Sequence, residues 1–485
     1  MSKTNEVGRT GFDRLSWTER IAFGSGDLAQ NLIYQTISIW LAFFYTNVFG
    51  LDPGYASVMF LVVRIIDVIW DPIVGAYIDK HNPKLGKYRA YLVFGGIPLV
   101  GFAILCFWNG LSDASETTKL LYAYVTYVGM SMCYTLVNVP YGALNASLTR
   151  DTNEITILTS TRMFMANLGG LLVSAGIPIF VCLMTGYGDI HNALSTALFM
   201  GLGSLPAFIF MPLVPAIKKK VGKRGMFNIF LTVAIVGMVL LYIVGLTELK
   251  KNDFVINVCQ FIKSTGVIVA TGYMWALVPE VISYSEFTSG KRISGIVNAL
   301  TGIFFKAGMA LGGFVPLFVL WLTKYKPTAS AQNGTTDPKA WFTTMLIYGL
   351  VALALLIFCF AKCKERVVMD EKETKNVKVS DLWMEFIHNR PLRILAFFFI
   401  TAFAMMSVGN AAGAYFMAER TNEAISSFQW QGILWLLCII PAILLVVAMF
   451  IISKYELSDE VMDRINKEIE DRHAQEAAPE SNTEK

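Results

Sequence analysis

Long apolar runs separated by short polar segments make up almost the whole chain. A helix that crosses a bilayer core of about 30 Å needs roughly 20 mainly apolar residues. Several runs exceed that length, which predicts helices that tilt or extend beyond the bilayer. The candidate spans lie near 20–48, 53–79, 88–109, 118–146, 159–184, 191–215, 225–246, 253–283, 292–323, 340–363, 390–418 and 428–453. The pattern predicts an all-α membrane protein with twelve transmembrane helices.

Basic residues in the connecting segments predict how these helices are oriented. Lys and Arg are enriched in the cytoplasmic loops of membrane proteins. The richer of the two alternating sets of segments has its basic residues at 80–89, 150, 218–224, 291–292 and 362–366, and it includes both ends of the chain. We therefore expect both termini to be cytoplasmic. The polar, basic start has no short apolar core and no cleavage site, so we interpret it as a cytoplasmic N-terminus and not as a signal peptide.

Composition excludes several other classes of protein. Hydrophobic residues make up 55% of the 485 residues, charged residues make up 16%, and the mean hydropathy is +0.53. About 25% of the residues in soluble domains are charged. This chain therefore has too few charged residues to cover the surfaces of two or three soluble domains. The net charge of +4 gives no support for nucleic-acid binding. The lipid bilayer is the expected environment.

The sequence contains no motif of an enzyme or an ATP-driven pump. The seven cysteines lie mostly inside apolar runs, and their spacing fits no zinc or haem pattern. No Walker loop, catalytic triad or HExxH motif is present. We therefore expect no enzyme activity, no metal and no cofactor.

Three polar segments are predicted to be solvated connectors. Segment 362–393 is the longest polar stretch between spans and reads as a cytoplasmic linker, whereas 324–340 reads as a turn-rich external loop. The tail from Lys454 begins as a charged surface helix and then becomes disordered.

The second span carries three charged residues, Arg64, Asp67 and Asp71. Their spacing of three and four residues places them on one face of a helix. A charge at mid-bilayer costs roughly 2.5–3.5 kcal/mol on insertion scales, so that face should not contact lipid. The two carboxylates could hold a proton or ligate a small cation. The alternative is a structural ion pair between Arg64 and one aspartate.

Other spans contain single charges. Asp27 in the first span could accept hydrogen bonds from the hydroxyls of a polar solute, or could be a water-accessible charge near the cytoplasmic end. Arg162 in the fifth span could be the counter-charge of Asp27, a bidentate donor to a solute, or half of a structural pair. Lys306 lies deep enough to reach a cavity or to be structural, and we assign it with Arg64 to a predicted gating charge network.

Polar residues in the fourth span and a basic turn complete the candidate set. Pro140 frees a carbonyl in mid-helix, close to the polar Thr135 and Asn138, which suits a cavity-lining helix or a packing kink. Asp79 ends the second span before a basic cluster, which predicts a cytoplasmic latch or simply a solvated loop.

Several segments together resemble the glycoside–pentoside–hexuronide:cation symporters, the melibiose-permease-like family of the major facilitator superfamily. The matching text is GSGDLAQ, FFYTNVFGL, RIIDVIWDPIVGAYID, KLGKYRAY, YTLVNVPYGAL, TRMFMANLGG and PEVISYSEFTSGKRISGI. Each segment alone is a weak match, but the combination is specific and touches most spans.

The resemblance implies two six-helix bundles around a central cavity, with alternating access. It implies that Asp27 and Arg162 contact sugar and that Asp67 and Asp71 contribute to the coupling-cation site. Tyr134, Thr135 and Asn138 would lie beside both sites.

The sequence departs from the family pattern at single residues. Asn138 stands where sodium-coupled members have an aspartate, which favours coupling to protons. Thr288 stands where many relatives have lysine, and Ser294 where many have glutamate. These two changes leave the usual cytoplasmic charge network around Glu286 and Arg292 in question.

The order of segments also departs from the family. Because the halves of the superfamily repeat, the basic turn after span two should recur after span eight, but its echo IKKKVGKRGMF follows span six. The long linker follows span ten. We expect helices of family type in the order one to five, eight to eleven, six, seven and twelve. The predicted divisions are 1–186 (N-terminal bundle, helices one to five), 187–325 (C-terminal bundle, eight to eleven), 326–375 (helix six and the start of the linker), 376–453 (helices seven and twelve) and 454–485 (cytoplasmic tail).

The function predicted from the sequence is symport of a sugar, glycoside, pentoside or hexuronide with co-transported H⁺ or Na⁺. The expected protein is a monomer in a bacterial cytoplasmic (inner) membrane. The alternative is a receptor or assembly partner that binds a solute without transporting it.

Overall fold

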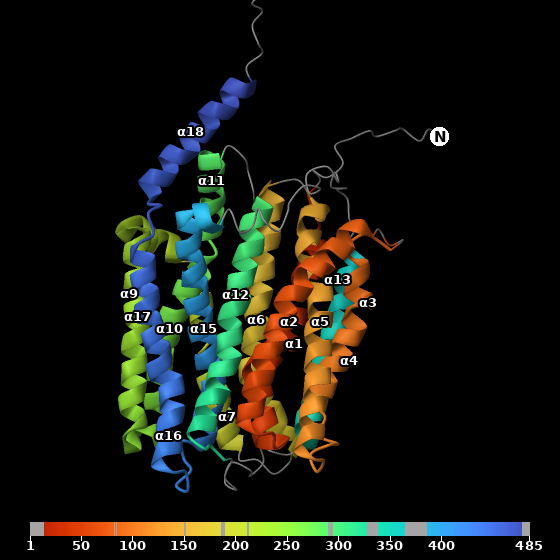
Figure 1. Cartoon of the computed structure of the whole chain (residues 1–485), viewed down its shortest axis with the longest axis vertical. Helices are drawn as coiled ribbons and strands as arrows, with labels where there is room; N and C mark the ends of the chain where they lie inside the picture. Colours follow the sequence, from red (N-terminus) through yellow and green to blue (C-terminus); the bar gives the residue numbers. More distant parts are fainter. Residues whose placement is uncertain are drawn as a thin grey trace, which may run out of the picture.

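Long helices running side by side form the described part of the chain (Figure 1). The structure, a computed structural model, describes residues 14–81, 83, 85–149, 152–185, 190–210, 213–289, 294–326, 338–363 and 386–477, and these contain no β-strand. The helices are α1 (Trp17–Thr36), η1 (Ile37–Leu41), η2 (Phe44–Val48), α2 (Pro53–Lys80), α3 (Ala90–Phe94), α4 (Gly96–Cys106), α5 (Glu116–Leu148), α6 (Thr152–Thr185), α7 (Ile190–Gly201), α8 (Leu205–Phe210), α9 (Val214–Gly245), η4 (Glu248–Lys251), α10 (Asp253–Met274), α11 (Leu277–Ser289), α12 (Ser294–Leu322), α13 (Pro338–Lys362), α15 (Arg390–Glu419), α16 (Ser427–Leu434), η5 (Trp435–Ile439), α17 (Ile440–Ser453) and α18 (Asp459–Ala477).

Helices lie at every predicted span, which confirms the all-α fold class. Within the described residues, nine helical segments are long and apolar enough to cross a membrane by length and composition alone. The first two predicted spans fall outside that set, and polar or charged residues such as Asp27, Arg64 and Asp67 interrupt their apolar runs. The third is divided at Gly95 into the short helices α3 and α4.

Local sequence signals fix the starts of several helices. Ser16 caps α1 in a reciprocal capping box with Glu19. Asp52 caps α2 by accepting a hydrogen bond from the Gly54 amide at 2.8 Å, and Pro53 occupies the first helical position. These caps satisfy backbone donors that the helix itself leaves unpaired.

The helices pack into two groups. In the first, α1 packs against α6 and α13, α2 packs against α5, and α4 packs against α5 and α13. In the second, α10 packs against α9, and α15 packs against α12 and α17. The groups meet where α2 packs against α12 and where α6 packs against α7, which belongs to the second group through its packing against α10 and α15. α18 extends away from one end of the bundle, and α16 lies at the opposite end (Figure 1).

Two helices differ from their predicted bounds. The predicted span 253–283 is broken between α10 and α11 because Pro279 cannot donate a backbone hydrogen bond and its ring clashes with the carbonyl four residues earlier. α9 begins at Val214, so the basic segment 218–224 is mostly helical and not a loop. A kink at Gly222 interrupts it, with φ of 71°, a left-handed conformation that glycine adopts without strain.

Apolar side chains cover the outward faces of the bundle. On α17, Ile443, Val446 and Phe450 are all exposed, although the helix contains no charged residue. An exposed apolar face of this kind is stable in lipid and not in water. In contrast, α18 is rich in charge, as predicted for a surface helix, although the end of the tail lies outside the described residues.

Candidate transport site

Asp27 and Arg162 form an ion pair between α1 and α6. Arg162 Nε donates to Asp27 Oδ2 at 3.2 Å, and the guanidinium lies over the ring of Tyr141, 5.1 Å from its centroid. The Asp27 side chain is 9% exposed and that of Arg162 is 27% exposed. The sequence predicted these two residues as counter-charges among other options, and the structure brings them together.

Small residues bring α1 and α6 close enough for this pair to form. A Cβ at Gly24 would lie 2.9 Å from Thr161 Cγ2, and one at Gly169 would lie 2.9 Å from Asn31 Cβ. Real Cβ atoms essentially never approach so closely. Glycine at these positions therefore sets the separation of the two helices.

A second cluster joins α2, α5 and α12. Arg64, Asp67 and Asp71 lie on one face of α2, as their spacing predicted, and Lys306 of α12 forms ion pairs with both aspartates. Lys306 Nζ lies 3.2 Å from Asp67 Oδ2, and Arg64 Nη1 lies 3.5 Å from the same oxygen. The Thr135 hydroxyl lies 3.1 Å from Asp67 Oδ1 and 2.9 Å from Asp71 Oδ1.

This second cluster balances its own charge. Two cations, Arg64 and Lys306, face two carboxylates, of which Asp67 is buried and Asp71 has a side chain 32% exposed. The Lys306 ammonium lies between the carboxylates, in the position that a small cation bound by both would take. Its contact with α2 also crosses between the two helix groups.

Aromatic rings lie between the two clusters. Tyr34 of α1 stacks on Tyr134 of α5 with ring centroids 4.9 Å apart, and the Arg64 guanidinium lies over the Tyr34 ring at 5.6 Å. Tyr134 therefore lies beside the α2 cluster, close to where the resemblance placed it. Asn138 is half-buried one turn further along α5.

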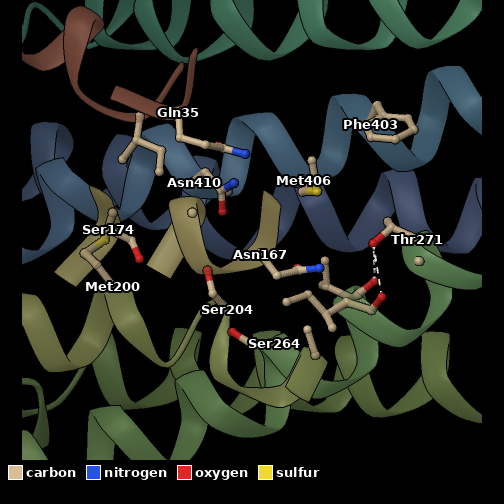
Figure 2. Close-up of a pocket in the computed structure, with 18 of the residues that line it drawn as sticks. Gln35, Asn167, Ser174, Met200, Ser204, Ser264, Thr271, Phe403, Met406 and Asn410 are labelled. Carbon is tan, nitrogen blue, oxygen red and sulfur yellow. Dashed lines mark hydrogen bonds between the residues drawn. The ribbon is translucent and has the colours of Figure 1, made fainter. Parts of the chain in front are cut away.

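A cavity of about 580 Å³ lies between the two helix groups. This volume falls in the range of about 300–1,000 Å³ for small-molecule sites. Amide and hydroxyl side chains from α1, α6 and α15 turn towards it, including Gln35, Asn167 and Asn410, while Ser264 and Thr271 line it from α10 (Figure 2). Such groups suit a solute that carries many hydroxyls.

None of the predicted aspartates Asp27, Asp67 and Asp71 lines this cavity. Asn31, a lining residue, donates a hydrogen bond to the Asp27 carbonyl at 2.9 Å, so Asp27 lies one turn of α1 away. Met163, also a lining residue, follows Arg162 directly. Among the described residues, the wall of this cavity therefore contains no carboxylate, and the Asp27–Arg162 pair lies one turn of α1 away from it.

The remaining candidates lie elsewhere. Glu286 is buried on α11. Asp79 belongs to the last turns of α2, but its side chain and all of Arg292 lie outside the described residues. The predicted latch and the charge network around Glu286 and Arg292 remain predictions.

Sequence reasoning missed the cavity residues of α10. Lys263 and Gln260 line the cavity, and both are buried. The signal was present, because Lys263 is the one charged residue in the run 254–272. The neutral amides Asn31, Gln35 and Asn410 gave a weaker signal, since polar residues in spans also serve helix packing.

A set of hydrogen bonds links the helix groups at the α16 end of the bundle. We name Thr46, Asn47, Tyr325, Tyr415 and Glu419 the polar clasp. The Thr46 and Tyr415 hydroxyls are 2.9 Å apart, Asn47 Nδ2 donates to the Tyr325 hydroxyl at 3.0 Å, and that hydroxyl donates to Glu419 at 2.7 Å. Burial, with a further contribution from Glu419, raises the pKa of Tyr325, so its hydroxyl stays a donor.

A family model described as MFS/sugar transport protein matches residues 22–198, 189–336 and 327–431. These stretches cover most of the chain and overlap at their ends.

Curated bacterial relatives match over most of their length. An uncharacterized symporter of Bacillus subtilis is 35% identical over 75% of this chain and 94% of the relative. A glucuronide carrier protein homolog of Escherichia coli is 28% identical over 76% and 99%, and an isoprimeverose transporter of Lactiplantibacillus pentosus is 25% identical over 73% and 91%. The family consists of transporters with a twelve-helix, two-domain fold, so the predictions of transport and of no enzyme activity are confirmed and the receptor alternative is not favoured. The chain is a multi-pass inner-membrane protein that carries out cation-coupled sugar symport, and it belongs to the glycoside–pentoside–hexuronide:cation symporter family of the major facilitator superfamily.

Proposed function

We propose that the solute binds in the 580 Å³ cavity and that its transport is coupled to a cation at the cluster of Asp67, Asp71, Thr135 and Lys306. The observation that carries this assignment is the pair of carboxylates bridged by Lys306 within the membrane-spanning bundle. Ionisable groups in such a position are costly and are retained mainly for function.

Coupling follows from competition for the two carboxylates. A proton or Na⁺ that binds Asp67 or Asp71 weakens their attraction to the Lys306 ammonium. Because that attraction joins α2 to α12, cation binding loosens one contact between the helix groups. The populations of the two access states then depend on whether the cation is bound.

Asp27 and Arg162 are proposed to contact the solute from the α1 side of the cavity. The carboxylate accepts from sugar hydroxyls and the guanidinium donates to them, which is the role that the family resemblance implied. Asn31 lines the cavity one turn of α1 from Asp27. A solute bound in the cavity would contact the Asp27–Arg162 pair if it extended beyond Asn31.

The co-transported ion is proposed to be a proton, with Na⁺ as the alternative. Asn138 places a neutral amide near the acidic cluster, so only two carboxylates are available for a metal ion there. Hard cations prefer several oxygen ligands, whereas a proton needs one carboxylate. No resident cofactor is proposed.

The substrate is proposed to be a sugar derivative of the kinds named for the relatives. Those names include a glucuronide carrier homolog, an isoprimeverose transporter and a putative glycoside/cation symporter. We also propose that the protein is a monomer with both termini cytoplasmic, so that the α18 end faces the cytoplasm. The positive charge of the segments at 218–224 supports this orientation.

Uptake into proteoliposomes tests the proposal. A panel of sugars and glycosides is offered with a proton gradient and a sodium gradient imposed separately, and accumulation of at least one solute under the proton gradient is expected. Asp71→Asn should lose gradient-driven uptake, because one of the two bridged carboxylates is removed, while Asp113→Asn in an exposed loop should not. Wild-type accumulation by Asp71→Asn would remove Asp71 from the coupling site, and solute binding without accumulation in the wild type would favour the receptor alternative.

A further inference from the structure

Lys263 is a buried ammonium that lines the cavity from the middle of α10. The residue is 7% exposed. Within the described residues, no carboxylate forms an ion pair with it and no group accepts a hydrogen bond from it. The charges of the two ion-pair clusters are balanced, since Asp27 pairs with Arg162, and Asp67 and Asp71 face Arg64 and Lys306. Lys263 is thus the one charged side chain among the described residues that line the cavity.

The polar group beside Lys263 in the cavity wall also lacks a partner. Gln260 lines the cavity one turn earlier on α10, and its buried Oε1 atom has no hydrogen-bond partner in the described structure. A polar group buried without a partner costs free energy, and a buried charge costs more. An aliphatic side chain at position 263 would pack in a membrane-spanning helix without this cost. A ligand that binds the ammonium would explain why a lysine is present.

Packing against α9 holds this part of α10 in place. A Cβ at Gly237 would lie 2.4 Å from the Lys263 backbone nitrogen, and one at Gly266 would lie 2.3 Å from the Phe230 carbonyl oxygen. The backbone that carries Lys263 is therefore fixed by direct contact between two helices. A lysine whose backbone is held beside a cavity has less conformational freedom to lose when it binds an anion there.

We propose that the transported solute is an anionic sugar derivative, carrying one carboxylate or sulfonate, and that Lys263 binds that group. The inference rests on the proposed function, because it takes the cavity as the transport site. The anion supplies the ammonium with a partner, and a charge-assisted hydrogen bond is stronger than one between neutral groups. The hydroxyls of the same solute donate to Gln260 and to the amides of α1 and α15.

Binding to purified protein in detergent tests the proposal. The probes are acid and neutral sugars matched in shape: methyl glucuronide, methyl galacturonide and a sulfonated methyl glucoside against methyl glucoside, methyl galactoside and methyl glucuronamide. Solute-dependent thermal stabilisation and the fluorescence of Trp275, a lining residue, report binding. The wild type is expected to prefer at least one acid over its neutral partner by about tenfold to a hundredfold, the scale of one charge-assisted hydrogen bond. Comparing the binding of the two uronides with that of the sulfonated glucoside shows whether the site prefers a carboxylate or a sulfonate.

Variants assign the preference to Lys263. Lys263→Met should lose the preference and keep the binding of the neutral sugars, while its unfolding temperature without solute stays the same or rises because an unpaired buried charge is gone. Lys263→Arg should keep a preference for acids, and Lys263→Gln replaces the methionine variant if that variant does not purify. Lys454→Met is the matched control, since that lysine lies beyond the end of α17.

Two results would overturn the inference. One is a wild type that binds no acid in the panel, or that binds acids no better than their neutral partners. The other is a preference for acids that survives in Lys263→Met, or in Lys263→Gln where that variant takes its place. Because the assay uses no ion gradient, its failure is separate from a failure of coupled uptake. Proteoliposomes that accumulate neutral sugars but none of the acids would support the proposed function while rejecting an anionic substrate.

Discussion

Charged residues inside apolar runs are the most informative single positions in this chain. Their cost in the membrane is enough to single out Asp27, Asp67 and Asp71 as functional candidates. The helical period also places Arg64 on the same face of α2 as the two aspartates. The partner in α12 could not be assigned from sequence, because it depends on how α2 and α12 pack. The sequence therefore predicted Lys306 as a deep lysine of a charge network without naming its partners, whereas its bridging position is a result of helix packing.

Replacing Asp27 by alanine should weaken solute binding. The change deletes an acceptor of hydroxyl groups and leaves the Arg162 guanidinium, now lacking its 3.2 Å partner, free to turn away. A loss of one charged hydrogen bond predicts an affinity about tenfold to a hundredfold lower. Isothermal titration with a transported sugar measures this, with Asp113→Ala as the control. Wild-type affinity in Asp27→Ala would show that Asp27 does not contact the solute.

At the scale of whole helices, periodicity and apolar length predicted where helices occur, and local backbone chemistry decided their ends. All twelve expected spans contain helices, because a run of about 20 apolar residues has few other stable forms in lipid. The break before Pro279 and the kink at Gly222 were missed. Each depends on one residue whose backbone behaviour overrides the surrounding pattern, and hydropathy does not register either.

The contact between α9 and α10 should be sensitive to one added methyl group. A Cβ at Gly266 would lie 2.3 Å from the Phe230 carbonyl oxygen and 2.4 Å from the Ala234 nitrogen, and backbone atoms do not move aside as flexible side chains do. Gly266→Ala should therefore destabilise the protein by about 1–3 kcal/mol. Thermal unfolding in detergent measures it. Gly142→Ala is the control, because a Cβ there meets nothing within 4 Å and should be neutral or stabilising.

At the scale of the whole molecule, we propose that the family's helices occur here in the rearranged order given above. The support is the packing of α13, which comes late in the chain yet lies against α1, α4 and α6. The family model also matches in three separate stretches, not one. The sequence suggested the order through its misplaced basic turn and linker, but whether one cavity still forms depends on contacts between helices far apart in the chain.

Cross-linking tests the placement of α13. A Cβ at Gly349 would lie 3.0 Å from Val100 Cγ1, close enough for cysteines at both positions to form a disulfide. Val100→Cys with Gly349→Cys, in a background without the seven native cysteines, should cross-link under mild oxidation, as mass spectrometry of the peptides would show. Gly349→Cys alone is the negative control, and Gly245→Cys with Leu434→Cys is a positive control within the second group. If the control disulfide between positions 245 and 434 forms and the disulfide between positions 100 and 349 does not, α13 does not lie against α4.

The polar clasp has a consequence for how readily the carrier changes shape. Two of its hydrogen bonds, Thr46 with Tyr415 and Asn47 with Tyr325, cross between the helix groups. At about 1 kcal/mol each, these two bonds raise the population of the conformation in which the groups are joined at the α16 end by roughly thirtyfold, relative to one without them. A solute that prefers a conformation without these two bonds by the same ratio would offset their contribution, so the bonds can join the two groups at this end without preventing the change between access states.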